Sequence, residues 1–332
     1  MNQSAPLVSV VIPMFNVEKY IDEAIRSVLS QTLDDFEVIC VDDGCTDSTV
    51  CRIQRFKDKR VRIIRQKHMG LSGARNTGFT AAKGKYIAML NPDDVWLPNK
   101  LLMHVVHLDA NPRVGVSFCP SLFIDDNSQL IGLGQYPRLK RISSAHIFCR
   151  NPVGNGSAAV IRRDALRDVA CYRKVNNKSR YLFFDEALKQ AEDIEFWLRL
   201  SLQTNWKFEG IRTPLTLYRT KASGRPLSLK KQLESWQLAV NRNREHYPEF
   251  FSKWYKRAKA YQYRYLARRA INKGRALTSI VFMSKALFTD IRILVEEPKR
   301  TLVTSACALL ALLPTPIYRS LEQLSIKVVS PP

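Results

Sequence analysis

The sequence lacks several features that mark particular protein classes. Its seven cysteines are odd in number and form no C-x-x-C pair, so we expect neither a zinc site nor a disulfide framework. No basic segment precedes the first apolar run, which argues against a signal peptide. The longest apolar stretch near the C-terminus, 302–313, is well short of the ~20 residues that a membrane-spanning helix needs. These absences favour a reducing, cytoplasmic location.

Acidic residues are also scarce. The chain has 30 Asp and Glu against 52 Lys and Arg, which gives a formal net charge of +22. The excess is greatest in residues 221–332, where 21 basic residues stand against 7 acidic ones. Such a surplus attracts phosphates, whether on nucleic acid, on lipid head groups or on a nucleotide sugar. The alternative is a solvated basic surface without a dedicated partner.

β-rich runs alternate with helical segments through the first 110 residues of the chain. This alternation predicts βαβ units and a mostly parallel central sheet with helices on both faces. The expected strands are 7–12, 38–41, 61–64 and 86–90, and the expected helices are 20–29, 47–56, 72–82 and 98–108. After a region of loops and short strands over 125–158, the pattern predicts a helix at 188–202.

The composition changes near Arg225-Pro226, after which the pattern is helical and basic with interleaved aromatics. We therefore expect two parts. Residues 1–225 form a catalytic α/β domain, and residues 226–332 form a helical, basic region that associates with a membrane or packs on the first part.

Two pairs of adjacent carboxylates follow apolar runs. Asp93-Asp94 comes after the run 86–90, and Asp42-Asp43 comes after 37–41. Open α/β sheets bind ligands at the carboxyl ends of their strands, so these acids indicate a site for a divalent metal and a nucleotide. Asp93 and Asp94 can instead cap the following helix. Asp47, in the turn that follows Asp42-Asp43, is expected to cap the next helix in the same way.

Two further segments carry candidate chemistry. The Gly-rich stretch 70–78 opens a helix and can present backbone N–H groups to a phosphate, with Arg75 adding a bidentate contact. It is not a Walker A sequence and lacks the G-x-G-x-x-G spacing. Glu192 and Asp193 precede an apolar helical face, where an acid can act as a general base. First-turn acids that favour the helix dipole are the alternative.

Taken together, these segments resemble the family-2 glycosyltransferases, which have the nucleotide-sugar-binding GT-A fold. The resemblance covers about residues 6–220 and is specific because several weak motifs occur in the right order. The motifs are Val8–Asn16, Ser27–Thr32, Val41–Gly44, Ala74–Gly78, Leu90–Asp94 and Glu192–Asp193 with Trp197–Arg199.

The resemblance implies roles for the residues that bind the donor. Pro13 and Phe15 would border the nucleobase, Asp43 beside Asp42 would hydrogen-bond it, and Glu18 would approach the ribose. Arg75 would lie near the base and the phosphates. UDP is the expected nucleotide.

It also implies the chemistry of transfer. Asp93, with Asn91, would bind Mg²⁺ or Mn²⁺ on the diphosphate, where the cation stabilises the leaving group. Asp193, next to Glu192, would deprotonate the acceptor hydroxyl in a single displacement with inversion.

Three positions depart from the family pattern. Asn91 replaces the first acid of the Asp-x-Asp metal motif, so the site has less negative charge. Phe15 replaces a tyrosine and keeps only the stacking face. The Tyr-Arg-x-His segment of the family is Tyr218-Arg219-Thr220-Lys221 here.

The expected partners are a nucleotide-sugar donor and a glycan or lipid-linked acceptor used in cell-surface polysaccharide synthesis, without nucleic acid. An anionic membrane on its cytoplasmic side would meet the basic region, with 302–314, 317 and 321 at the interface. The basic contacts would be Lys253, Lys256, Arg257, Lys259, Arg264, Arg268 and Arg269. Alternatives are a nucleotidyltransferase with a similar site, or a nucleic-acid-binding or scaffold protein that uses the basic tail.

Overall fold

The computed structural model describes residues 5–175, 178–220 and 228–313. The chain divides into two compact units, which are described separately. The first comprises residues 1–147 and 151–225, and the second comprises 148–150 and 226–332. Lys221, Ile317 and Leu321, which the sequence analysis singled out, lie outside the described residues.

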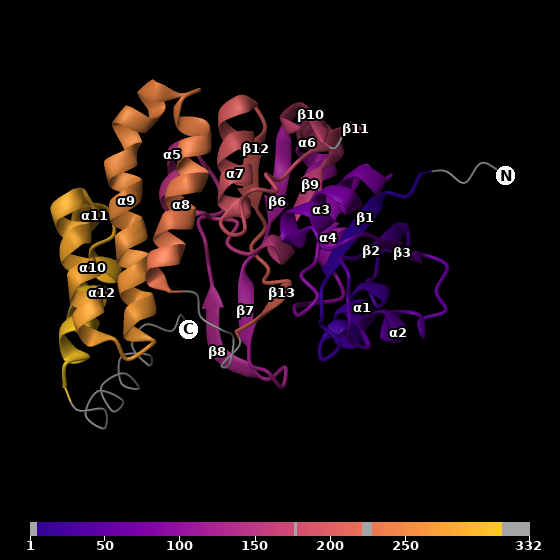
Figure 1. The fold of residues 1–332 in the computed structure, drawn as a ribbon, viewed down its shortest axis with the longest axis horizontal. Coiled ribbons are helices and arrows are strands. Elements are labelled where there is room, and N and C mark those ends of the chain that lie inside the picture. Colours follow the sequence, from indigo (N-terminus) through magenta and orange to yellow (C-terminus); the bar gives the residue numbers. More distant parts are fainter. Residues whose placement is uncertain (1–4, 176–177, 221–227, 314–332) are drawn as a thin grey trace. The chain divides into compact units, whose positions relative to one another are not determined.

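The first unit is built on a seven-stranded sheet with the order β12-β6-β9-β4-β1-β2-β3 (Figure 1). Every neighbouring pair is parallel except those of β9, which runs antiparallel to β4 and to β6. The mostly parallel sheet expected from the sequence is confirmed. The strands are β1 Val8–Met14, β2 Phe36–Asp42, β3 Val61–Arg65, β4 Tyr86–Met89, β6 Val114–Phe118, β9 Ala159–Arg162 and β12 Lys207–Gly210.

Side chains that alternate along the strands feed two hydrophobic cores, one on each face of the sheet. In β1, Val11 belongs to one core, whereas Val10 and Ile12 belong to the other. The Val11 face is covered by α3 Gly70–Ala81, α6 Arg163–Val169 and α7 Glu192–Gln203. The opposite face is covered by α1 Ile21–Leu29, α2 Thr49–Ile53 and α4 Lys100–Ala110.

Helix α3 packs very closely on β1. A Cβ atom added to Gly78 would lie 2.2 Å from Cγ1 of Val11, so only glycine allows this approach. The close packing fixes the position of the side chains that α3 carries one turn earlier, Arg75 among them.

Smaller elements complete the first unit. A four-stranded sheet has the order β5-β13-β7-β8, and β10 and β11 form a hairpin. The region 125–158, expected to hold loops and short strands, also contains a 3-10 turn, η1, and helix α5, whose last three residues belong to the second unit. The sequence predicted neither. The bounds are β5 Val95–Trp96, β7 Ser121–Ile124, β8 Leu130–Gln135, α5 Ser144–Arg150, η1 Gly156–Ala158, β10 Cys171–Val175, β11 Lys178–Leu182 and β13 Thr216–Arg219.

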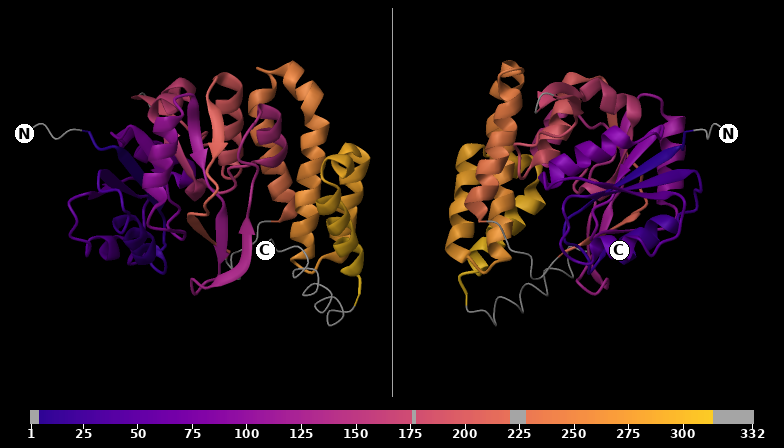
Figure 2. Two further views of the ribbon diagram at one scale, coloured as in Figure 1. Left: turned by 180° about the vertical axis from the view of Figure 1, so that it is seen from behind. Right: turned by 45° about the vertical axis from the view of Figure 1, so that its right-hand side comes forward.

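The second unit is helical, and Figure 2 shows α9, α10 and α12 side by side, in agreement with their packing contacts. Its small core includes Tyr261, Met283, Ala286 and Ile293. None of the described helices is both long and apolar enough to cross a bilayer. The helices are α8 Leu229–Arg244, α9 Pro248–Ile271, α10 Ala276–Thr289, α11 Arg292–Glu296 and α12 Pro298–Leu310.

Two arginines expected on a lipid-facing surface lie inside this unit instead. Arg257 is 6% exposed and its Nε donates to Asp290 at 2.8 Å. Arg264 is 1% exposed and donates to Thr301 at 2.6 Å and to Glu297. Their expected role at a membrane is therefore wrong, because ion pairs between α9 and the following helices hold both guanidinium groups.

Candidate active site

The turn that follows β4 is held by its own polar side chains. The Asn91 backbone N–H donates to Ser157 Oγ at 2.9 Å, and Ser157 Oγ donates to Asp94 Oδ2 at 2.6 Å. The Asn91 amide N–H donates to the same Asp94 oxygen at 3.0 Å. Asp94 is buried, and burial together with the charge of Asp93 raises its pKa to about 7. Asp94 is therefore an internal support of the turn.

Arg219, at the end of β13, fixes the same turn from the other side. Its backbone N–H donates to Asp94 Oδ1 at 3.0 Å, and its Nε donates to the carbonyl of Asp93 at 2.8 Å. The guanidinium group also forms an ion pair with Glu23 at 2.6 Å. The sequence analysis did not assign a role to Arg219, although the Tyr-Arg segment that contains it was a signal. Asp93 itself is half-buried.

Arg75 joins three segments that are far apart in the sequence. Its guanidinium donates to Asn91 Oδ1 at 3.2 Å and to Glu192 Oε1 at 2.8 Å. The side chain is 4% exposed and lies over the ring of Phe184. One buried charge therefore links α3, the turn after β4 and the first residue of α7. The Nε atom of Arg75 is buried without a partner among the described residues.

Glu192 and Asp193 open α7, after Ala191 in a left-handed conformation with φ of +58°. Glu192 is buried and paired with Arg75, so it serves as the counter-ion. Asp193 is half-buried, and its Oδ1 accepts from the N–H of Ile194 at 2.9 Å. Burial and the charge of Glu192 raise the pKa of Asp193 to about 6, while Arg75 opposes the rise. A carboxylate with this pKa can accept a proton near neutral pH.

Asn76 is a positioning residue that the sequence analysis missed. Its Oδ1 accepts from the N–H groups of Phe183 and Phe184 at 2.9 and 2.8 Å. Its Nδ2 donates to the Phe184 carbonyl and to Glu186 Oε1, both at 2.9 Å. The buried Asn76 side chain thus ties α3 to the segment that leads into α7. Its place beside Arg75 in the 74–78 motif was the available signal.

Asp43 caps the start of α3. Its Oδ1 accepts from Gln66 Nε2 and from the Met69 N–H, at 2.6 and 2.8 Å. Its Oδ2 accepts from the Gly70 N–H at 2.9 Å and lies 2.9 Å from His68 Nδ1. The N–H groups of Met69 and Gly70 at the start of α3 are therefore already bound to a carboxylate and are not open to a phosphate. Of the groups around the Asp43 carboxylate, the His68 side chain is exposed to solvent.

The remaining residues of the expected base site surround Asp43. The Phe15 ring is 46% exposed and lies 4.2 Å from the His68 ring, centroid to centroid. Pro13 is buried in β1. Asp42 Oδ1 accepts from the Cys45 N–H at 2.8 Å, which closes the turn that follows β2.

Glu18 is bound to the start of α2. Its Oε2 accepts from the Ser48 N–H at 2.9 Å, and its own N–H donates to Asp47 Oδ2 at 3.1 Å. Asp47 also accepts from the Thr49 N–H at 3.0 Å, so the expected capping by Asp47 is confirmed. In this structure the Glu18 carboxylate thus stabilises the turn and the helix start.

The family model named Glycosyl transferase family 2 matches residues 9–170. These residues belong to that family. The matched segment contains the turn after β2, Arg75 and the turn after β4, whereas α7 with Asp193 lies beyond it.

Two relatives of this glycosyltransferase domain illustrate its similarity to curated proteins. An uncharacterized glycosyltransferase of Haemophilus influenzae is 28% identical over 211 residues, which cover 60% of this chain and 61% of that protein. The UDP-Glc:alpha-D-GlcNAc-diphosphoundecaprenol beta-1,3-glucosyltransferase WfgD of Escherichia coli is 35% identical over 128 residues, 38% of this chain and 49% of that protein. The chain thus spans less than two thirds of the length of either relative.

Two solved structures share the fold of this chain. S. aureus TarS 1-349, in complex with UDP-GlcNAc, has a TM-score of 0.55 at 19% identity and covers 85% of this chain and 88% of its own. The mannosyltransferase PcManGT from Pyrobaculum calidifontis, in complex with GDP-Man and Mn²⁺, has a TM-score of 0.53 at 18% identity, with coverage of 93% and 86%. At this identity the likeness supports the fold alone, and the expected GT-A fold is confirmed.

The donor set at the turn after β4 fits a cation that a diphosphate brings with it. Among the described residues, no three His, Cys, Asp or Glu side chains cluster as a metal cage. Mg²⁺ and Mn²⁺ usually take one or two protein carboxylates and fill the other positions with phosphate and water. Asp93 provides one carboxylate. The amide oxygen of Asn91 accepts one bond from Arg75 and keeps a second lone pair.

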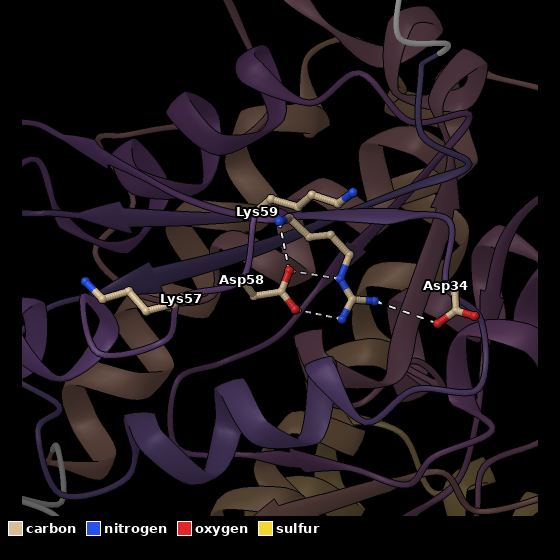
Figure 3. A pocket seen from close by; sticks show the side chains of 5 residues that line it. Asp34, Lys57, Asp58 and Lys59 are labelled. Atoms are coloured by element: carbon tan, nitrogen blue, oxygen red, sulfur yellow. Dashed lines mark hydrogen bonds and ion pairs between the residues drawn. The ribbon is translucent and has the colours of Figure 1, made fainter.

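A separate surface pocket lies away from this site. It is lined by residues that precede β2 and β3, at the amino ends of the parallel strands (Figure 3). Arg60 there forms an ion pair with Asp58 at 2.8 Å and lies 3.9 Å from Asp34. The strand-end carboxylates occupy the opposite edge of the sheet, so this pocket takes no part in the site.

We predict that Asn76→Ala lowers the free energy of unfolding by about 2–4 kcal/mol, because it leaves two buried backbone N–H groups without an acceptor. Urea denaturation measures the loss, and hydrogen exchange at 183–186 should speed up. Asn99→Ala is the control: this exposed residue is the N-cap of α4, but its side chain caps no N–H, so the change in stability should be less than about 0.5 kcal/mol. Equal stability of the two variants would contradict the positioning role.

Proposed function

We propose that this protein is an inverting glycosyltransferase that moves a sugar from a nucleotide-diphosphate sugar, with UDP as the nucleotide, to a hydroxyl of a glycan or lipid-linked acceptor. The observation that carries the proposal is the bridge by Arg75, which brings Asn91 and Glu192 to one guanidinium group. Asp93 follows Asn91 in the same turn, and Asp193 follows Glu192 on the same helix. Asp93, the proposed ligand of the cation, and Asp193, the proposed acceptor of the proton, are thus each close in sequence to a residue that Arg75 binds.

The nucleobase stacks on the exposed ring of Phe15, next to buried Pro13. An N–H of the base that approaches Asp43 finds Oδ1 already accepting two bonds and Oδ2 accepting one, with His68 Nδ1 2.9 Å from Oδ2. His68 can move away from Oδ2 most easily, since its side chain is 57% exposed. Asp42 and Glu18 keep the turn around the base and the ribose in shape.

Asp93, assisted by Asn91, holds the Mg²⁺ or Mn²⁺ that accompanies the diphosphate. When bound, the cation stabilises the negative charge of the leaving nucleoside diphosphate as a Lewis acid. The Mn²⁺ bound with GDP-Man in the Pyrobaculum calidifontis mannosyltransferase supports this assignment by fold. Because Asn91 is neutral, the site depends on the phosphates for much of its affinity for the cation.

Asp193 accepts the proton of the acceptor hydroxyl while the oxygen attacks the anomeric carbon. The bond from that carbon to the diphosphate oxygen breaks on the opposite side, so the configuration inverts. The charge of Glu192, which is paired with Arg75, raises the basicity of Asp193. A raised pKa makes the carboxylate a better base while it remains mostly ionised at pH 7.

The acceptor is assigned by analogy with the Escherichia coli relative, whose name specifies a sugar on diphosphoundecaprenol. An acceptor of this kind is anchored in a membrane, which fits a role in surface polysaccharide synthesis on the cytoplasmic face. The basic excess of residues 221–332 supports the same location.

Asp193→Asn tests the base. We expect kcat to fall by about 10²–10⁴-fold, because the amide cannot accept the proton, while donor binding stays unchanged. Transfer assays and thermal shift with UDP-sugars and Mn²⁺ measure the two effects. Asp164→Asn, a surface carboxylate that is 65% exposed, is the control. Full activity of the Asp193 variant would remove the assignment.

The pH profile tests the same group without removing it. Asp193 works as the ionised base, so kcat/KM should rise about tenfold per pH unit up to about 6 and level off above it. Glu192→Gln removes the negative charge that raises the pKa, so the acid limb should move to lower pH. A limb that stays in place, or moves upward, would show that another group limits the rate.

Asp93→Ala tests the cation ligand. We expect the Mn²⁺-dependent part of donor binding to be lost, since no other carboxylate is assigned to the cation. Isothermal titration with UDP-sugar, with and without Mn²⁺, separates this part. The control is Asp34→Ala in the pocket of Figure 3, which should bind the donor like the parent protein. If Asp93→Ala keeps the full response to Mn²⁺, the metal assignment fails.

A further inference from the structure

Helices α10 to α12 of the second unit expose an unusual number of large apolar side chains. Phe288 is 92% exposed, Val295 81% and Leu277 74%. Soluble proteins rarely leave so much apolar surface together without a binding function. We name as the apolar face the residues Leu277, Val281, Phe288, Val295, Leu302 and Leu309, all at least half exposed.

The helical spacing collects these side chains into stripes. On α10, positions 277, 281 and 288 fall within about 40° of one another at about 100° per residue. On α12, positions 302 and 309 are two turns apart and point the same way. The buried side chains Met283 and Ala286 occupy the other side of α10, in the core shared with α9. The stripes therefore face away from the core of the unit.

The charges around the apolar face are almost entirely positive. Residues 271–313 contain only three acids, Asp290, Glu296 and Glu297. Each of them is bound to at least one arginine. By contrast, three exposed basic residues have no acidic partner among the described residues: Arg275, Lys285 and Lys299.

We propose that the apolar face docks in the surface of an anionic lipid bilayer, with these three cations contacting the head groups. Apolar side chains beside unpaired Lys and Arg are typical of helices that lie in the plane of such a surface. A second copy of the chain is a poorer occupant, because two-fold pairing would bring the same cations face to face. The docking deepens the proposed function, since a lipid-linked acceptor lies in the same surface.

The test uses the full chain and vesicle flotation. Vesicles of phosphatidylcholine alone are compared with vesicles that also contain phosphatidylglycerol, and the parent protein should bind the anionic ones. The variant with Phe288→Ser, Val295→Ser and Leu302→Ser should bind about 1,000-fold more weakly, since each of the three lost side chains contributes about tenfold. Leu102→Ser with Val106→Ser removes exposed apolar groups from α4 and is the matched control.

A second variant examines the cations and avoids any effect on apolar packing. Lys285→Glu with Lys299→Glu should abolish the preference for anionic vesicles while the protein stays folded. Parent protein that ignores both kinds of vesicle, or variants that bind as well as the parent, would overturn the proposal. So would a dimer, seen by sedimentation, that the serine variant dissociates, because a second copy then covers the face.

A measurement of nucleotide-sugar binding distinguishes a failure of the docking proposal from a failure of the proposed function. Thermal shift with UDP-sugar and Mn²⁺ should be the same for the parent and for both docking variants, since none of these residues belongs to the catalytic site. If the parent binds vesicles but no nucleotide sugar, the docking surface stands and the transferase proposal falls. If it binds the donor but no vesicles, the reverse holds.

Discussion

The buried guanidinium group of Arg75 is the interaction on which the rest of the site depends. Burying a charge is costly unless it is paired and hydrogen-bonded, and Glu192 and Asn91 meet these needs with bonds of 2.8 and 3.2 Å. The same group sets the electrostatics of Asp193, because Arg75 lowers the pKa that burial and Glu192 raise. The pKa of Asp193 and the placement of the turn after β4 are thereby linked through one side chain. Helix α3 carries that side chain, and its first turn is fixed in turn by Asp43.

The two adjacent acids after β4 have different tasks, and the structure explains why. Asp94 is buried, and its oxygens accept bonds from Ser157, from the amide of Asn91 and from the backbone of Arg219. These donors hold the turn in one shape. Asp93 is only half-buried, and the turn is fixed through its carbonyl, which Arg219 binds. Asp94 therefore provides rigidity, whereas the half-buried Asp93 is the proposed ligand of the cation.

Much of the fold and part of the site could be predicted from the sequence. The period of apolar residues specifies strands and helices locally, and strand-end acids such as Asp93 follow directly from that pattern. The partners of buried polar groups could not be predicted in this way. Asn76 binds residues more than 100 positions away, and Arg219 reaches Glu23 and Asp93, so only the tertiary fold decides their roles. The burial of Arg257 was missed for the same reason, because its acidic partners come from later helices.

The neutral residue at position 91, a departure from the Asp-x-Asp pattern, follows from the buried acid three residues later. The side chain there has to act in both directions at once: its oxygen accepts from Arg75, and its N–H group donates to Asp94. An amide can do both, whereas a carboxylate can only accept. Aspartate at this position would place a second negative charge 3.0 Å from the buried oxygen of Asp94, in surroundings that already raise the pKa of that group to about 7. Asparagine therefore keeps the turn rigid and gives it one negative charge fewer, so a cation at the proposed site would depend more on the negative charge of the donor's diphosphate.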